Sequence, residues 1–524
     1  MTAPLGSRIS REDFVESIDR HPQTPDASFD GGDLDCGSGL LLLIRRHIDP
    51  LDRGGLLEVR STEPSVEEDL PAWCRLTGNE LISWTRRGRQ RSFLICKGRL
   101  VERTERMKTN NVALTTPQPM VIAPELAASR NNPAPTPPPK IPALAVMGIG
   151  SWPRPIWLLR ALQERLQGRL SEEEFQATAD DAVRLCIDAQ HRAGADVLTD
   201  GEQRRNDYAS FVGSLLDNCQ LIPLTDLLPL VEHPEEFEAQ LQGLGIPGDR
   251  VRHPAVFGRL KRREPLALRE LQFLKTLAHG PIKIALPGPY LLTRTMWLEC
   301  MADRAYATRE DLAEDIVRIL QEELHDLLAE GAALVQFDEP VLTEVVFSPP
   351  AARRTFMCGA LSAKGERERE LAFAEELINR VVQGESRERT AIHVCRGNWT
   401  ADESAVLSGS YRPLLPLLQR LNVGAILLEF CTPRAGDLDD LEKIPDAVRL
   451  GIGVVNPKDQ RVEPVEAIID KGTKAIRRFG KDRVFLTPDC GFATFADTPV
   501  ATTTIAEGKL RAIARAAEAL KQQE

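Results

Sequence analysis

The stretch 309–340, with the sequence REDLAEDIVRILQEELHDLLAEGAALVQFDEP, contains the unit that decides the fold of most of the chain. Its first part, Arg309–Glu330, has apolar residues at helical spacing and predicts an amphipathic helix. The short apolar run Ala333–Phe337 is typical of a buried strand, and it ends in the polar turn Asp338-Glu339-Pro340. A helix followed directly by a buried strand indicates an α/β domain.

The same alternation recurs on both sides of this stretch. Further amphipathic segments at Glu366–Gln383, Val465–Phe479 and Ile505–Gln522 predict helices. Eight alternations of strand and helix predict a (β/α)8 barrel rather than a Rossmann sheet, which would have fewer units and a glycine-rich first turn. The stretch Gln203–Gly280 is too long for one crossover, so we expect an inserted helical hairpin or lid there. The eight predicted strands are Leu144–Ile149, Asp196–Thr199, Ile282–Leu286, Ala333–Phe337, Ala391–Cys395, Ala425–Phe430, Leu450–Val455 and Arg483–Thr487.

Prolines divide the chain into two regions. Pro117, Pro119 and the triplet Pro137–Pro139 predict a semi-rigid linker over residues 109–142, because proline fits neither helix interiors nor central strands. Residues 143–524 after the linker form the predicted barrel. Residues 29–108 before it form a smaller module, preceded by a tail of residues 1–28.

The composition argues against several classes of function. The chain of 524 residues carries 66 basic and 77 acidic side chains, a net charge of −11, without a basic block that could follow a phosphate backbone. We therefore expect no nucleic-acid partner. Apolar runs such as Val423–Leu428 are much shorter than the roughly 20 residues that cross a bilayer, and no signal-peptide pattern is present, so we expect a cytoplasmic protein without membrane contact. Ten scattered cysteines do not form a disulfide scaffold and are predicted to be free thiols, metal ligands or redox groups.

Reactive side chains gather at the ends of the predicted strands, where barrel enzymes place their active sites. His393 and Cys395 are two residues apart on one strand, so both point to the same side. Glu429 ends the next strand and Cys490 ends the last, so closure of the barrel can bring all four together. Nitrogen, sulfur and carboxylate donors suit tetrahedral Zn²⁺, and the thiolates argue against Mg²⁺ or Ca²⁺. The sequence therefore predicts a zinc site.

Other interpretations of these residues stay open. A buried cysteine is more often a small apolar core residue than a ligand. Glu429 could pair with Arg434 at the barrel mouth, and Cys431 is a reserve ligand. Asp338 could act as a cap of the turn that ends its strand. The metal interpretation is favoured because the four candidate ligands occur together at three strand ends.

Residues from about 143 to the C-terminus resemble the catalytic domain of cobalamin-independent methionine synthase. The resemblance is closer to the short core members of that superfamily, which include epoxyalkane:coenzyme M transferases. It implies a zinc-dependent S-alkyltransferase that activates a small-molecule thiol for alkyl transfer, with methyl as the expected alkyl group. The matching segments, in chain order, are IGSWPRP (149–155), DGEQRRND (200–207), GPY (288–290), FDEP (337–340), HVC (393–395), LLEF (427–430) and TPDCGF (487–492).

The resemblance also implies roles for single residues. A metal-bound thiol is deprotonated near neutral pH and can attack an alkyl carbon, whereas a free thiol is mostly protonated there. Carried over residue by residue, the implied zinc ligands are His393, Cys395, Glu429 and Cys490.

A second implied set holds the amino-acid part of a thiol substrate such as homocysteine. Glu202 and Asp338 are acceptors for an ammonium and are the implied catalytic carboxylates. The Ser151 hydroxyl and nearby backbone N–H groups can receive a carboxylate. The implied substrate-binding residues are Ile149, Ser151, Glu202 and Asp338.

The chain departs from the family at two places. Methionine synthase proper has a histidine after the seventh strand that is thought to pass a proton to the methyl donor, whereas this chain has Asn456 at the matching place. The chain also does not contain the family's large N-terminal half, which helps to hold the polyglutamylated folate. The alkyl donor therefore stays unidentified, with a folate, a corrinoid or an epoxide as options.

Residues 29–99 resemble a second family, the TusA-like sulfur carriers, which fold as a small two-layer α+β sandwich. The matched features include Phe29-Asp30, Cys36, the apolar helix Leu40–Ile48 and the strand Gly55–Ser61. In that family the first cysteine carries a persulfide within a C-P-x-P motif. This chain has C-G-S-G at positions 36–39, with both prolines replaced by glycine.

Cys36 is the candidate reactive group of this module. A helix start favours its thiolate, whereas Asp33 and Asp35 raise its pKa. Two alternative functions follow. In one, a Cys36 persulfide, supplied by sulfur-relay proteins, makes or breaks a C–S bond at the barrel zinc. In the other, the chain is a non-catalytic scaffold for sulfur trafficking.

Overall fold

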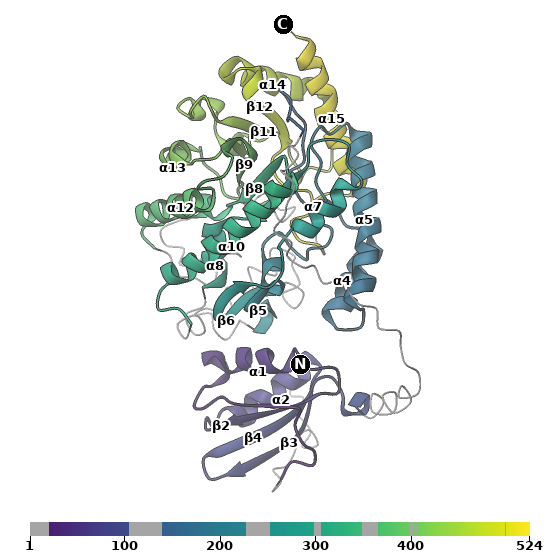
Figure 1. The fold of residues 1–524 in the computed structure, drawn as a ribbon, viewed down its shortest axis with the longest axis vertical. Coiled ribbons are helices and arrows are strands. Elements are labelled where there is room, and N and C mark those ends of the chain that lie inside the picture. The colour runs from purple at the N-terminus through teal and green to yellow at the C-terminus, as the bar shows by residue number, and fades with distance from the viewer. Residues whose placement is uncertain are drawn as a thin grey trace, which may run out of the picture. The chain divides into compact units, whose positions relative to one another are not determined.

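The computed structural model describes residues 20–103, 139–226, 252–297, 305–347, 365–398, 403, 406–497 and 499–523. They divide into two compact units, one within residues 1–129 and 226–234 and the other within residues 130–225 and 235–524 (Figure 1). Most of the predicted tail of residues 1–28 and of the predicted linker of residues 109–142 lies outside the described residues, so both stay predictions.

The smaller unit has two layers, as expected for this module. Its strands β1 (Ala27–Asp30), β2 (Leu56–Ser61), β3 (Glu80–Arg87) and β4 (Gln90–Cys96) form one sheet in the order β1-β2-β4-β3. The first pair is parallel and the other two are antiparallel. Alternate residues of β2 and β4, including Val59 and Phe93, share one apolar core with two helices of the unit. These helices are α1 (Leu41–Ile48) and α2 (Val66–Thr77).

The larger unit is built around a closed ring of parallel strands. Six of them pair in chain order in one sheet. The first two predicted strands are reduced to isolated parallel bridges, Met147 with Val197 and Leu198 with Ile282, and the bridge of Val146 with Leu486 closes the ring. The predicted barrel of eight strands is therefore confirmed. The six strands of the sheet are β7 (Lys283–Pro287), β8 (Leu334–Asp338), β9 (Thr390–Val394), β10 (Ala425–Leu428), β11 (Arg449–Val455) and β12 (Val484–Pro488).

Helices cover the outside of this ring (Figure 1). Thr308 caps the start of α10, and Leu320 and Leu324 on that helix belong to the same core as Val335 on β8. The predicted bounds of α10 and α14 are confirmed, and those of α12 and α15 are right to within two residues. The described helices of this unit are α4 (Ile156–Leu166), α5 (Glu172–Ala193), α7 (Leu268–Lys275), α8 (Pro289–Met296), α10 (Arg309–Glu330), α11 (Val341–Phe347), α12 (Arg367–Val381), α13 (Leu415–Arg420), α14 (Val465–Phe479) and α15 (Thr503–Gln522).

The described part of the insertion between the second and third barrel strands contains a strand pair that was not predicted, and the predicted helical hairpin or lid stays a prediction. This pair is antiparallel and consists of β5 (Leu216–Pro223) and β6 (Arg252–Arg262), followed by α7. Pro254 lies inside β6, opposite Leu221, at a position where a helix would not tolerate proline. The pairing of the two strands satisfies the backbone groups that a helix would otherwise have satisfied. Residues 227–251 of the predicted insertion lie outside the described residues.

The interior of the barrel changes from apolar to polar along the strands. Toward the strand starts, Met147, Val197, Ala391 and Phe485 belong to one buried apolar cluster. Further along the same strands, polar side chains such as His393 take the inward positions. The apolar layer therefore supports a polar layer at the carboxyl ends of the strands.

Candidate metal centre

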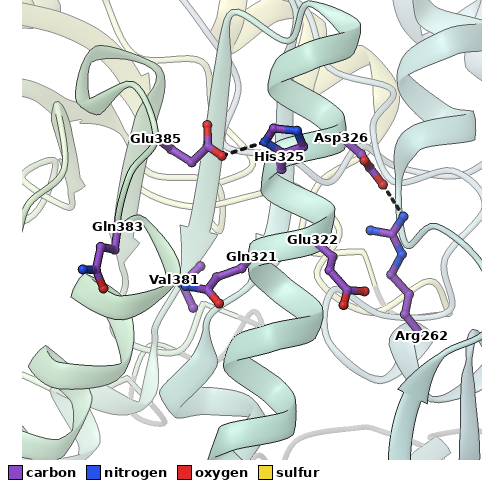
Figure 2. A pocket seen from close by; sticks show the side chains of 8 residues that line it. All are labelled: Arg262, Gln321, Glu322, His325, Asp326, Val381, Gln383 and Glu385. Atoms are coloured by element: carbon purple, nitrogen blue, oxygen red, sulfur yellow. Dashed lines mark hydrogen bonds and ion pairs between the residues drawn. The ribbon is translucent and has the colours of Figure 1, made fainter. Parts of the chain in front are cut away.

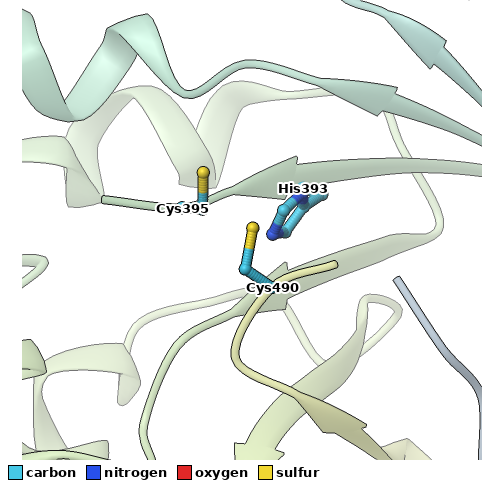
Figure 3. Close-up of side chains that lie close together, drawn as sticks. All are labelled: His393, Cys395 and Cys490. Atoms are coloured by element: carbon cyan, nitrogen blue, oxygen red, sulfur yellow. The ribbon is translucent and has the colours of Figure 1, made fainter. Parts of the chain in front are cut away.

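Three predicted ligands meet at the carboxyl end of the barrel. One ligand atom each of His393, Cys395 and Cys490 lies within 4.8 Å of the other two, and all three residues are buried. Figure 3 shows His393 and Cys395 beside each other along one stretch of chain, with Cys490 approaching them from another. Tetrahedral zinc with bonds of about 2.0–2.3 Å needs ligand atoms about 3.3–3.8 Å apart, so small side-chain movements would suffice. No other such group of three occurs among the described residues.

The two thiols of this centre interact with each other. A hydrogen bond from Cys490 lowers the pKa of Cys395 and raises that of Cys490, and the nearby His393 lowers the pKa of Cys395 further. Of the two thiols, Cys395 therefore ionises more readily than Cys490. Both can give up their protons when a cation binds.

The His393 ring is oriented for a metal. Its Nδ1 lies 2.9 Å from Asp338 Oδ1, and the strand register places the two residues opposite each other on β9 and β8. Its Nε2 is buried and has no hydrogen-bond partner within the described ranges. A carboxylate on one ring nitrogen and a free lone pair on the other is the usual arrangement of a metal-binding histidine. Asp338 therefore has a second partner besides the predicted substrate ammonium.

Glu429 lies near the centre, but its carboxylate is outside the group of three. Its Oε1 accepts hydrogen bonds from the Arg396 backbone N–H, 2.6 Å away, and from the Asn398 side chain, while Arg434 lies 3.4 Å from Oε2. The pairing of Glu429 with Arg434, raised from the sequence, is thus present. Glu429 as fourth ligand stays a prediction.

The reserve ligand Cys431 is also outside the group. Its sulfur lies 3.3 Å from Lys471 Nζ. Burial raises the pKa of Cys431 to about 12, even with the ammonium of Lys471 beside it. Cys431 therefore serves as a matched cysteine for comparison with the two cysteines of the centre.

A pocket beside the three ligands collects the predicted substrate residues. Ile149, Ser151, Glu202 and Asp338 all line it together with His393, Cys395 and Cys490. Part of this lining was not predicted from the sequence. Two of the missed residues could have been found, because Tyr208 directly follows the matched segment 200–207 and Thr494 lies two residues after the matched segment 487–492. The lining residues that were not predicted are Tyr208, Pro340, Asn398, Gly491 and Thr494.

Two glycines allow polar side chains to approach the pocket closely. A Cβ atom at Gly150 would lie 2.2 Å from Glu202 Oε1, and one at Gly491 would lie 2.1 Å from Ser151 Oγ. Both distances are far shorter than a carbon–oxygen contact allows. The glycines at these strand ends are therefore required by the placement of Glu202 and Ser151.

Glu202 has unusual backbone and side-chain surroundings. Its φ of 55° is rare for a residue with a side chain, and Asp200 accepts a hydrogen bond from its backbone N–H at 3.0 Å. Burial raises the pKa of Glu202 to about 8; Arg205 lowers it and Asp338 raises it further. Its Oε2 is buried and has no partner in the described part of the chain. A strained, unpartnered buried carboxyl that lines a pocket is typical of a functional group.

Asn456 follows β11 at the place where the family has its acid. Its side-chain amide donates a hydrogen bond to Glu403 at 2.8 Å, and it is not among the described residues that line the pocket. This amide cannot supply a proton. The replacement of the family's histidine by Asn456 therefore leaves no acid at this position.

Cys36 belongs to the smaller unit and begins the short helix η2 (Cys36–Leu40). Only 7% of it is exposed. Burial raises the pKa of Cys36 to about 12, and Asp69, by charge and hydrogen bond, and Asp35 raise it further. Of the two aspartates predicted to raise this pKa, Asp35 does so with a smaller effect than Asp69, and Asp33 is not among the causes. Cys74 and Cys96 of the same unit are buried core residues.

A second hollow lies on the outer surface of the barrel unit (Figure 2). It is lined by residues of α10 and of the segment that leads into β9, at the amino-terminal ends of the strands. His325 pairs with Glu385 at 3.0 Å and Arg262 pairs with Asp326, so its charged groups are mutually satisfied. Barrel enzymes do their chemistry at the opposite ends of the strands. This hollow contains none of the predicted site residues.

Comparison with known proteins agrees with this geometry. Residues 144–518 match the family model described as the catalytic domain of cobalamin-independent synthase. The methionine synthase of Saccharolobus solfataricus is 25% identical over 353 residues, which are 67% of this chain and 89% of that protein. The methionine synthase of Thermococcus kodakarensis is 29% identical over 360 residues, 67% of this chain and 88% of that protein.

Two solved structures have a similar fold. A B12-independent methionine synthase from a Shewanella species, in complex with selenomethionine, has a TM-score of 0.55 at 24% identity and covers 72% of this chain and 98% of its own. A putative vitamin-B12 independent methionine synthase from Listeria monocytogenes has a TM-score of 0.53 at 17% identity and covers 73% of this chain and 99% of its own. Within the described residues, none of the helices has the length and apolar character needed to cross a membrane.

Proposed function

Because the chain belongs to the family of cobalamin-independent methionine synthase catalytic domains, we propose that it transfers an alkyl group to a thiol held beside His393, Cys395 and Cys490. One observation carries the proposal: the three ligand atoms converge in the pocket that Glu202 and Ser151 also line. The simplest alkyl group is methyl. The substrate would be a small-molecule thiol.

The donor set fits zinc. His393 Nε2 is buried without a partner among the described residues, and two cysteine sulfurs lie beside it. His393, Cys395 and Cys490 would hold the ion, with Glu429 as the proposed fourth ligand. Bound zinc would supply a deprotonated substrate thiol near neutral pH.

The chain's own residues would bind and orient the substrate. Glu202 would accept a hydrogen bond from a substrate ammonium, which would also favour the ionised form of its carboxyl. Ser151 would donate its hydroxyl to a substrate carboxylate. The buried pocket would keep water away from the reacting sulfur.

The alkyl donor is constrained by the segment after β11. Asn456 is held by Glu403 and offers no acid there. The proposal therefore does not include methyltetrahydrofolate. It favours a donor whose leaving group needs no proton from this segment, such as a corrinoid.

The metal centre can be tested by elemental analysis of the purified full chain. We expect about one zinc per chain in the wild type, and loss of most of it in Cys395→Ser and Cys490→Ser, because each removes a thiolate ligand. Cys431→Ser is the matched control, since Cys431 is half-buried nearby but outside the group. Full zinc in both Cys395→Ser and Cys490→Ser would contradict the proposal.

We further propose that the smaller unit is a TusA-like module attached to the barrel. Its two layers and the position of Cys36 at a helix start support this. The raised pKa of Cys36 argues against a ready nucleophilic thiolate. Sulfur transfer through a Cys36 persulfide is therefore the weaker alternative.

A further inference from the structure

A line of buried side chains leads from the inside of the barrel to the candidate metal centre. Lys283 Nζ lies 2.7 Å from Gln336 Oε1, and Gln336 Nε2 lies 2.7 Å from Asp338 Oδ1. The same Asp338 oxygen lies 2.9 Å from His393 Nδ1. Lys283 and Gln336 are fully buried, and neither lines the pocket nor has a role in the proposed reaction.

Strand geometry places these residues in line. Gln336 and Asp338 are two apart on β8, so both point into the barrel. Asp338 is opposite His393 on β9, and Gln336 is opposite Ala285, two residues after Lys283 on β7. Lys283 therefore rises from the apolar layer toward Gln336. Its Nζ also lies 2.6 Å from the Gly148 backbone oxygen, which anchors it to the first strand of the ring.

Each hydrogen bond along this line has a defined donor and acceptor. The Lys283 amine supplies at least two N–H donors in either protonation state, so it can donate to both Gly148 and Gln336. In the structure the amide oxygen of Gln336 accepts from Lys283, and its NH₂ group donates to Asp338. The Asp338 oxygen accepts from that NH₂ group, and it also accepts from His393 when the proton of the ring is on Nδ1.

The consequence appears at the other ring nitrogen. With the proton on Nδ1, the Nε2 lone pair of His393 faces the cysteine pair, and Nε2 has no protein partner among the residues described. Without the Lys283 donor, the Gln336 amide could turn over and present its oxygen to Asp338. That oxygen would repel the carboxylate, and Asp338 would lose one of the contacts that hold it against His393.

We propose that Lys283 and Gln336 are positioning residues that fix the tautomer and orientation of His393 for metal binding. The inference rests on the proposed metal centre. Lys283 would act on His393 without contacting it, through the side chains of Gln336 and Asp338. The partners of metal-binding histidines commonly change metal affinity by about 10–100-fold.

The first measurement is zinc affinity of the full chain, by competition with a chromogenic chelator. Lys283→Met, which keeps the unbranched shape and most of the length of the side chain without the donors, should bind zinc at least about tenfold more weakly than the wild type. The matched control is Lys509→Met. Lys509 on α15 is also fully buried and donates to the Arg461 backbone oxygen and to Glu463, away from the centre. This control should retain wild-type zinc affinity.

The second measurement reads the histidine itself. The chain has only 8 histidines, so ¹⁵N labelling of histidine can resolve the His393 ring in the metal-free protein. We expect the Nδ1–H form in the wild type and in Lys509→Met, and a mixture with the Nε2–H form in Lys283→Met. A merely structural lysine would change stability without changing this ratio.

The outcomes separate the inference from the proposed function. Zinc affinity and tautomer ratio equal to wild type in Lys283→Met would overturn the inference, as would equal loss of zinc in Lys283→Met and Lys509→Met. If Lys283→Met does not fold, Gln336→Leu provides the test with the lysine intact, and unchanged values there overturn it too. A wild type that binds no zinc would instead overturn the metal centre itself.

Discussion

Replacing Glu202 by glutamine should change how the stability of the metal-free chain depends on pH. The substitution keeps the size of the side chain and removes its charge. Burial raises the pKa of Glu202 to about 8 from an ordinary value of 4.5. Between these values the folded chain holds a proton that the unfolded chain has released, so the free energy of unfolding falls as the pH rises.

The size of the effect follows from the shift. Each pKa unit corresponds to about 1.4 kcal/mol, so the shift to about 8 corresponds to roughly 5 kcal/mol once Glu202 is ionised in both states. Most of this loss occurs below the folded pKa. Between pH 6 and pH 8 the wild type should lose about 2 kcal/mol relative to Glu202→Gln.

Urea unfolding followed by tryptophan fluorescence at pH 6, 7 and 8 measures this difference. Glu173→Gln is the control for the loss of a charge, because Glu173 is exposed on α5. We expect the stability of Glu202→Gln relative to the wild type to rise with pH, and that of Glu173→Gln to stay level. Parallel curves for Glu202→Gln and the wild type from pH 6 to pH 8 would refute the argument from burial.

Two further predictions concern the substrate and the smaller unit. If the thiol substrate is an amino acid, Asp338→Asn should weaken its binding by roughly 1.5–3 kcal/mol in calorimetry, the range for a hydrogen bond to a charged group; unchanged affinity would point to a thiol without an ammonium. Because burial and Asp69 hold Cys36 protonated, Cys36→Ala should leave zinc content and alkyl transfer to a free thiol unchanged. If Cys36→Ala instead loses turnover only when the substrate is a sulfur carrier, the persulfide alternative is supported.

Much of the fold could be predicted because the relevant patterns are local. The bounds of α10 depend on helical spacing and a capping residue within one segment, and the strand β9 depends on a short apolar run. His393 and Cys395 could be paired as ligands because side chains two apart on a strand share a face. The strand pair β5 and β6 in the insertion could not be predicted, because its pairing joins residues far apart in the sequence.

Local sequence patterns predict the order of helices and strands and the residue types at the strand ends. Which of those residues meet depends on how distant segments pack. This packing brought Cys490 to His393, left the Glu429 carboxylate with Arg396 and Asn398, and connected Lys283 to the centre through Gln336. The physical reason is that burial and closure of the ring act between distant segments. These set hydrogen-bond partners and pKa values that no local pattern contains.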